Sequence, residues 1–380
     1  MKQFIYADNA ATTKMSDVAV KAMLPYLQEI YANASSVHLL GQRSAAALFS
    51  ARQQVAQVLN CAPKEVFFTS GGSEADNQAL ISAAALGKKQ GKCHIVSTAM
   101  EHHAILHTLE ALQAEGFTVT LLHPQADGIV TATQVAEAIT DNTCLVSVMY
   151  ANNETGSIQP IREIGALCRK HGVLFHTDAV QAAGHLAIDV QRDNIDMLSL
   201  SAHKFHGPKG IGLLFAKSNI QLTSLIRGGG QERGKRAGTE NLPGIIGLTV
   251  ALKDAQENMQ QNTAYITGLR DALRNGLDKI DGAGFNGSRE HCLPGTVNYS
   301  FQGVNGEALL SLLSNEGICC SSGSACSAGS LEPSHVLLAL GLSHETAQSA
   351  LRFSLCEYNT MDEIQTIITK VTEAVNRLRR

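Results

Sequence analysis

Short apolar runs alternate with amphipathic segments between residues 66 and 216. Runs such as residues 66–69 and 195–200 lack a polar face, which is typical of strands buried on both sides. Segments such as residues 161–171 instead place apolar side chains at helical spacing. This regular alternation predicts an α/β fold, in which a largely parallel sheet carries helices on both faces. Further strands are expected at residues 93–97, 119–122, 145–150, 173–178 and 211–216, and further helices at residues 74–88 and 132–138.

The pattern changes after residue 228. Residues 228–239 are rich in glycine, lysine and arginine and predict a flexible, basic loop. A long helix at residues 242–278 then leads to short strands near residues 295–301 and 317–320. Because 380 residues exceed one ordinary core, we expect two domains. The large domain is predicted at residues 15–255, and the small domain at residues 1–14 and 256–380.

Composition excludes several classes of protein. A net charge of −4 leaves no basic surface for nucleic acid or an anionic membrane. No apolar run approaches the roughly 18 residues of a membrane span, and the first residues resemble neither a signal nor a transit peptide. The nine cysteines are odd in number and show no Cys-x-x-Cys spacing, which argues against a disulfide framework or a zinc site. We therefore expect a cytoplasmic protein.

Chemically useful side chains follow the predicted strands. Because the carboxyl ends of parallel strands share one edge of a sheet, these side chains are expected to meet there. They offer an anion cradle, an imidazole, a carboxamide, a carboxylate and an amine. In chain order they are Gly71, Gly72, Ser73, His102, Asn153, Asp178, Gln181, Ser201, His203 and Lys204.

Lys204, Asp178 and the glycine turn together suggest pyridoxal phosphate. The lysine can form a Schiff base with the cofactor aldehyde, and the aspartate can keep the pyridine nitrogen protonated. Gly71 and Gly72 let the backbone approach a phosphate at a helix N-terminus. Taken singly, each feature has a plainer interpretation: Lys204 as a solvated loop lysine, and the glycine segment as an ordinary turn capped by Ser73.

Two further residues extend this hypothesis. Arg352 offers a planar fork for a substrate carboxylate, or else belongs to a structural ion pair. Cys326 lies in a Gly/Ser-rich segment, where we expect an exposed, mobile thiol that can attack an electrophilic sulfur, or else simply a small loop residue. Cys319 and Cys320 precede it and are expected to be small apolar side chains of a strand, with a redox or sulfur-relay role as the alternative.

The combined motifs resemble the cysteine desulfurases of the NifS/IscS type, in the class V aminotransferase group. The resemblance extends from about residue 6 to beyond residue 352. It depends on residues 69–77, 101–102, 152–154, 178–181, 201–204, 321–326, 331–335 and 352–354.

The resemblance implies a homodimer with the pyridoxal-phosphate type I fold, in which a large domain with a mainly parallel seven-stranded sheet adjoins a smaller α/β domain. It implies conversion of L-cysteine to L-alanine plus a persulfide on Cys326, carried on a loop of about residues 321–332. The sulfur would pass to acceptors for iron–sulfur cluster assembly or other thio-cofactors, with a scaffold protein of the IscU/NifU type as partner. Alternatives are a selenocysteine lyase, an aminotransferase on the same fold, or a non-catalytic binding protein.

The resemblance also implies a role for each matching residue. Lys204 would be the Schiff-base lysine and proton shuttle, His102 would stack on the ring, and Cys326 would be the nucleophile. The other cofactor-binding residues would be Asp178, Gln181, Gly72, Ser73, Ser201, His203, Asn153 and, from the partner subunit, Thr239. Asn153 and Arg352 would hold the substrate carboxylate. No resident metal is expected, although Cys326 could transiently ligate a cluster.

One segment departs from the family pattern. Residues 355–358 read Leu-Cys-Glu-Tyr where Leu-Gly-Arg-Phe is common. Glu357 therefore replaces a positive charge by a negative one close in sequence to Arg352. This exchange is expected to alter the electrostatics of carboxylate binding. The role of Cys356 stays open.

Overall fold

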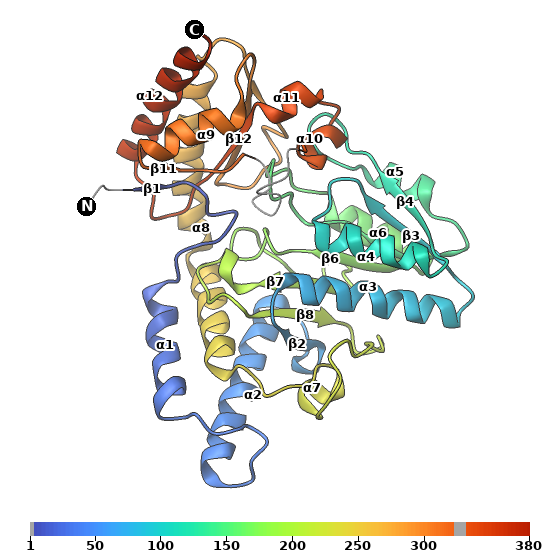
Figure 1. The fold of residues 1–380 in the computed structure, drawn as a ribbon. Helices are drawn as coiled ribbons and strands as arrows, with labels where there is room; N and C mark the ends of the chain where they lie inside the picture. Colours follow the sequence, from blue (N-terminus) through green and yellow to red (C-terminus); the bar gives the residue numbers. More distant parts are fainter. Residues whose placement is uncertain (1–3, 323–331) are drawn as a thin grey trace.

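A seven-stranded mixed sheet forms the centre of the molecule in the computed structural model, which describes residues 4–322 and 332–380 (Figure 1). The strand order is β2-β8-β7-β6-β5-β3-β4. Only β8 runs antiparallel to its neighbours, and the four pairs from β7 to β4 are parallel, as the alternating pattern predicts. The strands are β2 (Val66–Thr69), β3 (His94–Thr98), β4 (Thr118–Leu122), β5 (Thr143–Ser147), β6 (Leu174–Asp178), β7 (Met197–Ser201) and β8 (Gly212–Ala216).

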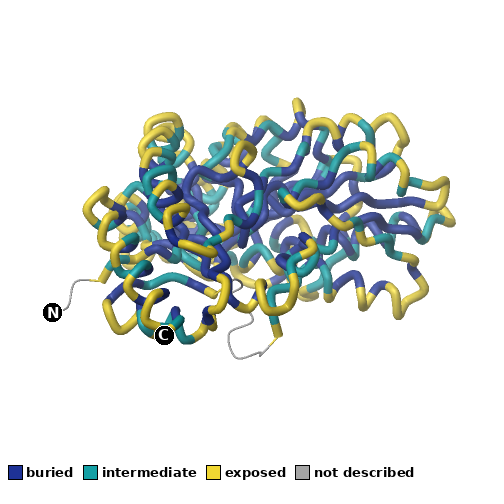
Figure 2. Tube along the Cα trace, turned by 90° about the horizontal axis from the view of Figure 1, so that it is seen from above, coloured by how far each residue is buried: buried dark blue, intermediate teal, exposed yellow. Residues whose placement is uncertain are grey.

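Successive residues of each central strand face different helical layers. Val146 packs into one core cluster and its neighbour Leu145 into another, and Leu198 and Met197 divide in the same way. This follows from the two-residue period of a strand, and it explains why these runs are apolar throughout. Both faces are therefore buried, as the dark interior of the sheet in Figure 2 shows.

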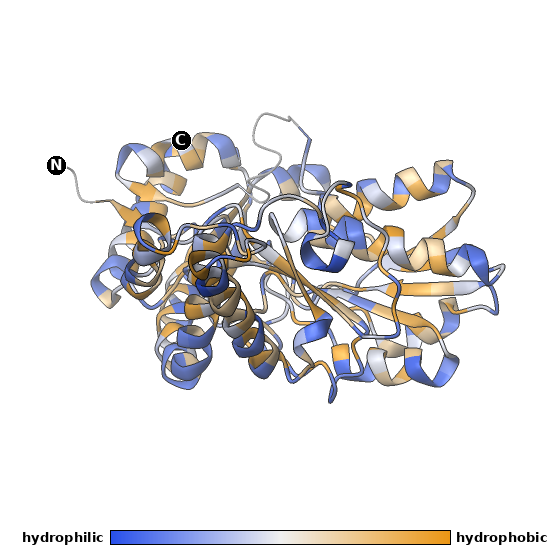
Figure 3. Cartoon of the chain, turned by 90° about the horizontal axis from the view of Figure 1, so that it is seen from below, coloured by the Kyte–Doolittle hydropathy of each residue, from blue (hydrophilic) through white to orange (hydrophobic). Residues whose placement is uncertain are grey.

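Helices cover both faces. α3 (Gly72–Lys89) and α4 (His103–Ala114) supply residues to one core cluster, and α2 (Leu39–Leu59) and α6 (Ile161–His171) to the other. Most helices carry both hydrophilic and hydrophobic residues, as expected for elements with one face on a sheet (Figure 3). The remaining helices are α1 (Asp17–Gln28), α5 (Ala132–Ala138), α7 (Gln231–Gly234), α9 (Gly306–Asn315), α10 (His335–Ala339), α11 (His344–Gln348) and α12 (Met361–Leu378).

One long helix connects two cores. Leu248 and Leu252 of α8 (Leu242–Leu277) pack in the cluster beside the central sheet, whereas Leu269 and Leu273 pack in a separate cluster. This second cluster surrounds a three-stranded antiparallel sheet of β9 (Ala283–Phe285), β10 (Thr296–Phe301) and β12 (Ala350–Ser354). The predicted domain boundary at residue 255 thus falls inside a continuous helix, and the division into domains stays a prediction.

The N-terminal segment lies beside the second core. β1 (Ile5–Tyr6) pairs in parallel with β11 (Ile318–Cys319), and Ala7 is buried in the second cluster. Cys319 lies in this short strand as predicted, and Cys320 directly follows it. No helix in the described ranges has the length and apolar character needed to cross a membrane.

Within the predicted loop at residues 228–239, residues 231–234 form the short helix α7, and long-range contacts hold the segment. Glu232 is 5% exposed and pairs with Arg52 of α2, with an Nη2–Oε1 distance of 2.6 Å. Arg236 pairs with Glu74 of α3 at 3.0 Å, and Lys235 accepts a hydrogen bond from Gln78 through its backbone carbonyl. These long-range contacts hold the segment against the sheet, and local composition gives no sign of them.

Candidate functional site

A cavity of about 240 Å³ lies where the parallel strands end. This is near the lower end of the range for small-molecule sites, about 300 Å³. Strand β6 contributes Asp178, the short turn after β7 contributes Lys204, and the start of α4 contributes His102. Nearly all the residues predicted for the strand ends therefore line one cavity. The lining comprises Ala10, Ala11, Gly72, Ser73, Asp76, His102, Met149, Ala151, Asn153, Asp178, Val180, Gln181, Ser201, His203, Lys204 and Arg352.

The first turn of α3 forms one wall. Its N-cap is Gly71, and no side chain of the described residues caps it, so the interpretation of Ser73 as a cap is wrong. The uncapped N–H groups of an 18-residue helix favour an anion. At Gly72 a Cβ atom would come within 2.7 Å of Val180 Cγ2. Glycine is therefore required for this wall to keep its shape.

Asp178 occupies the interior end of the cavity. Its side chain is buried, and Oδ1 accepts a hydrogen bond of 2.9 Å from the Val180 backbone N–H. Burial raises the pKa of Asp178 to about 6, while that hydrogen bond and the Lys204 charge act in the opposite direction. A buried carboxylate in this position favours a cationic N–H group as its partner.

The N-terminal segment holds Lys204. The Nζ atom donates to the carbonyl oxygens of Ala10 and Ala11 at 2.5 and 2.9 Å. Gln181 donates to the same Ala10 carbonyl at 2.9 Å. The Nδ1 atom of His203 lies 3.1 Å from the Oγ1 atom of Thr12. Residues 10–12 thus orient three cavity residues, and sequence reasoning did not identify this role.

His102 rather than His103 lines the cavity, as the predicted assignment requires. The Ala104 N–H donates to His102 Nδ1 at 3.1 Å, so the ring proton of the neutral form resides on Nε2. Burial, followed by the charges of Lys204 and nearby histidines, lowers the pKa of His102 to about 4. The imidazole is therefore neutral near pH 7. His103 instead contacts His107 and His335, with ring centroids 5.0 and 4.6 Å away.

Arg352 combines the two roles considered for it. It is 1% exposed, and its Nη2 atom lies 2.9 Å from Asp8 Oδ1 in a structural ion pair. Its Nη1 atom donates to the Asn153 carbonyl at 2.9 Å, and the side chain still lines the cavity. Within the described part of the chain, buried Nε has no hydrogen-bond partner. The Nε–H group of Arg352 is thus left for a further acceptor.

Cys326 lies outside the described residues, but both flanks of its segment are anchored at the site. The Ser321 and Arg352 backbones exchange hydrogen bonds of 3.1 and 2.7 Å. Beyond the segment, Ser334 donates to the buried carboxylate of Glu154 at 2.5 Å. The described residues on either side of residues 323–331 are thus held beside Arg352, which lines the cavity, and beside Glu154.

Asp76 is a cavity residue that sequence reasoning missed as a functional group. It is 1% exposed, and its Oδ1 atom has no hydrogen-bond partner among the described residues. Burial and then the neighbouring Asp178 raise the pKa of Asp76. A charged residue on the buried face of a predicted helix is the signal that could have identified it. Thr239, in contrast, is exposed and absent from the described lining, so its reach into a partner subunit stays a prediction.

These residues fit pyridoxal phosphate. The free N–H groups of α3 and the space at Gly72 match a phosphate, and buried Asp178 matches a pyridinium nitrogen. Val180, Met149 and Ala151 provide apolar contacts for a ring, and Lys204 provides the amine. The donor set therefore suits the cofactor that the sequence suggests.

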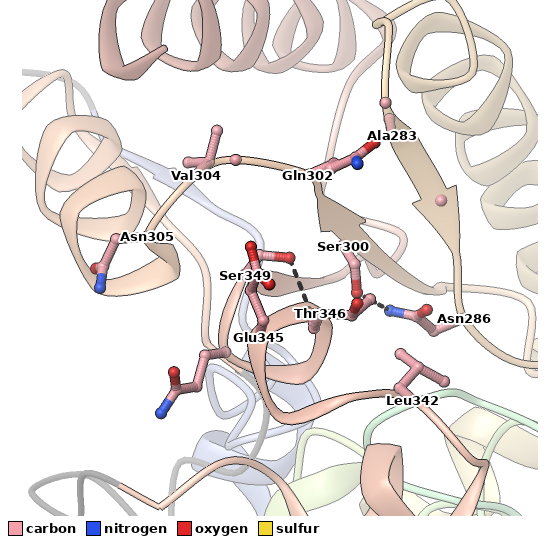
Figure 4. A pocket seen from close by; sticks show the side chains of 14 residues that line it. Ala283, Asn286, Ser300, Gln302, Val304, Asn305, Leu342, Glu345, Thr346 and Ser349 are labelled. Carbon is pink, nitrogen blue, oxygen red and sulfur yellow. Dashed lines mark hydrogen bonds between the residues drawn. The ribbon is translucent and has the colours of Figure 1, made fainter.

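A larger hollow of about 740 Å³ lies in the region of the second core, between β9, β10 and α11 (Figure 4). Its lining is mainly glycine, serine, asparagine and glutamine. Glu345 is the one charged side chain in that described lining. This described lining offers serine and threonine hydroxyls but no pair of titratable groups to activate them, so we assign the chemistry to the smaller cavity.

Comparison with known proteins gives a consistent result. The model of the family "Aminotransferase class-V" matches residues 5–367. A cysteine desulfurase IscS of Clostridium botulinum is 47% identical over all of this chain and 96% of its own length. A cysteine desulfurase IscS of Methanosarcina thermophila is 45% identical over 99% of this chain and 93% of its own length.

Solved structures agree in fold. A NifS-like protein superposes with a TM-score of 0.93 at 37% identity, covering 99% of this chain and 100% of that one. SspA in complex with cysteine superposes with a TM-score of 0.82 at 39% identity, covering 93% and 99%. The family match at residues 5–367 thus spans both core regions and the described cavity lining.

Proposed function

Because the chain belongs to the cysteine desulfurases of the aminotransferase class-V family, we propose that it converts L-cysteine to L-alanine and a persulfide on Cys326. This family depends on pyridoxal phosphate. When bound, the cofactor supplies an electron-accepting ring that stabilises negative charge at the substrate's α-carbon. The main support is that Lys204, Asp178 and the uncapped start of α3 share one cavity.

The polar residues of the cavity divide the work of binding. Gly72, Ser73, Ser201 and His203 hold the phosphate, with Thr239 of the partner subunit completing the set. Asp178 holds the proton of the ring nitrogen, and Gln181 binds the ring hydroxyl. Arg352 and Asn153 hold the substrate carboxylate. For Arg352 the support is the buried Nε atom that has no partner in the described structure.

Lys204 and His102 handle protons. The Nζ atom of Lys204 removes the proton from the α-carbon of the substrate. Hydrogen bonds from Nζ to the carbonyl oxygens of Ala10 and Ala11 hold the amine at the cavity. The neutral ring of His102 lines the cavity, where it would contact the bound cofactor and exchange a proton through Nε2.

Cys326 performs the sulfur transfer. Its thiolate attacks the Sγ atom of bound cysteine, so that an S–S bond forms while the substrate's Cβ–Sγ bond breaks. The electron pair of the broken bond stays with the carbon, which is protonated to become the methyl group of alanine. The described residues on either side of residues 323–331 support this assignment, because Ser321 pairs with the backbone of Arg352 and Ser334 donates to Glu154, the neighbour of Asn153.

The finer parts of the proposal rest on the family resemblance. These are a homodimer in the cytoplasm and transfer of the persulfide sulfur to an IscU/NifU-like scaffold for iron–sulfur cluster assembly or to another thio-cofactor pathway.

Replacing Cys326 tests the proposal. Cys326→Ala should keep the visible absorbance of the bound cofactor but lower alanine and sulfide formation from L-cysteine by at least about a hundredfold. The matched control is Cys61→Ser, a half-buried cysteine outside the cavity, which should retain activity. Sulfide release that survives in Cys326→Ala would show that the nucleophile is wrong. Amino transfer to an α-keto acid would identify an aminotransferase, and selective, Cys326-independent cleavage of selenocysteine would identify a lyase.

A further inference from the structure

Three metal-ligand types meet behind the cofactor cavity. The ligand atoms of His206, Cys356 and Glu357 all lie within 4.8 Å of one another. His206 and Cys356 are buried, whereas Glu357 is half-buried. Cys356 and Glu357 are also two of the three residues that depart from the family pattern at residues 355–358. The proposed desulfurase chemistry uses none of the three.

The orientation of His206 is that of a metal ligand. Its Nδ1 atom lies 2.8 Å from the Lys14 carbonyl oxygen, and because a carbonyl can only accept, Nδ1 carries the proton. The lone pair of the neutral ring is therefore on Nε2. A histidine that binds a metal through one ring nitrogen usually donates the N–H of its other ring nitrogen to a carbonyl or carboxylate. That hydrogen bond sets the tautomer and the orientation of the ring.

The Nε2 atom of His206 faces the other two residues of the group, Cys356 and Glu357. The side chain of His206 is 9% exposed, and Nε2 is buried and unsatisfied within the described part of the chain. Nε2 lies 3.4 Å from Glu357 Oε2, which is an ion-pair contact when the ring is protonated. A lone pair that faces a carboxylate is unfavourable, so a proton or a metal ion must lie between Nε2 and Glu357.

The backbone of His206 is also unusual. Its φ angle is +62°, in the left-handed region that side chains other than glycine seldom adopt. Hydrogen bonds hold it there: the His206 N–H donates to Thr13 Oγ1 at 2.9 Å, and its carbonyl accepts from the Ser16 N–H at 3.0 Å. Strained residues of this kind concentrate at functional sites.

We propose that His206, Cys356 and Glu357 bind a divalent cation of the zinc class. The nitrogen, sulfur and oxygen donors match the preferences of Zn²⁺, and ligand atoms around tetrahedral zinc are separated by about 3.3–3.8 Å. An inward shift of about 1 Å would therefore close the site. On binding, a metal–sulfur bond replaces the S–H bond of Cys356, and the thiol proton passes to the buffer. Because the Glu357 side chain is 25% exposed, water can supply the fourth ligand.

Metal binding would join two parts of the catalytic region. His206 follows Lys204 by two residues, and Cys356 follows Arg352 by four. The cation would therefore tie the turn that carries the cofactor lysine to the end of β12, which carries the carboxylate-binding arginine. This gives the protein a means to sense metal close to, but separate from, the cavity.

Zinc titration of the cofactor-loaded Cys326→Ser protein tests the proposal, since that background removes the thiol that the proposed function treats as the nucleophile. We expect one Zn²⁺ per chain by calorimetry, with proton release visible as a dependence of the enthalpy on the buffer. Cys356→Ala and Glu357→Gln should each weaken binding at least about tenfold. Cys61→Ser should leave it unchanged. Glu357→Gln is nearly isosteric and partly exposed, so it keeps the test valid if Cys356→Ala folds poorly.

Cobalt provides an independent readout. In difference spectra, Co²⁺ added to the same background should produce a sulfur-to-metal charge-transfer band that Cys356→Ala abolishes and Glu357→Gln alters. Failure of the parent protein to bind Zn²⁺ would overturn the proposal and would mean that a proton, not a metal, separates His206 from Glu357. Unchanged zinc affinity in Cys356→Ala or in Glu357→Gln would overturn it as well.

Discussion

At Gly72 the absence of a side chain keeps the cavity open. The adjacent Gly71 differs, because among the described residues a Cβ there would meet only Ser201 Oγ, at an ordinary 3.8 Å. A Cβ at Gly72 would meet Val180, whose short side chain has little freedom to move away. Two neighbouring glycines in one motif thus have different physical requirements.

We expect Gly72→Ala to weaken cofactor binding about tenfold, because the added methyl group pushes Val180 and the first turn of α3 apart. Gly71→Ala should bind the cofactor with nearly unchanged affinity. Titration of both cofactor-free variants with pyridoxal phosphate, followed by absorbance, checks this. Equal affinities for the two variants would contradict the role of Gly72.

Among the elements, the segment around α7 depends on buried charge. Arg52 donates to both carboxylate oxygens of Glu232, and the Phe68 N–H donates to Glu232 Oε2 at 3.1 Å. Both ion-pair side chains are at most 10% exposed. Removing one partner would leave the other as an uncompensated buried charge.

Glu232→Gln should therefore destabilise the fold by about 3 kcal/mol and lower the thermal midpoint by several degrees. The control is Glu373→Gln, which removes the exposed pair with Lys370 and should leave the midpoint unchanged. A thermal scan of both variants decides the matter. If Glu232→Gln melts like the parent, the ion pair does not hold this segment.

At the scale of the whole molecule, the central sheet buries neutral histidine. His176 on β6 lies between the hydroxyl groups of Ser147 and Ser199, at 2.9 and 3.0 Å. Burial lowers its pKa to about 3. The same side chain in an unfolded chain titrates near about 6.5. Between these values the unfolded state binds a proton that the folded state excludes, so stability falls as the pH drops below about 6.5.

At pH 5 this effect is expected to cost about 2 kcal/mol for His176. His176→Gln should be less stable than the parent at pH 8, but its urea midpoint should fall less between pH 8 and pH 5. His344→Gln, at an exposed position, should keep the parent's pH dependence. Identical pH dependence in parent and His176→Gln would contradict the prediction.

The sequence by itself determined the layered α/β architecture and the group of residues around Lys204. Two-sided burial makes a strand apolar throughout, and parallel strands deliver their following residues to one edge, so both features follow from local patterns. Tertiary structure alone decided which charged groups pair. The Lys204 amine bonds to the Ala10 carbonyl 194 residues away, and Arg352 bonds to Asp8 344 residues away. The burial of Glu232 and the meeting of His206 with Glu357 were decided in the same way. Such pairs depend on how distant segments pack in three dimensions, and neither hydrophobic period nor composition encodes that.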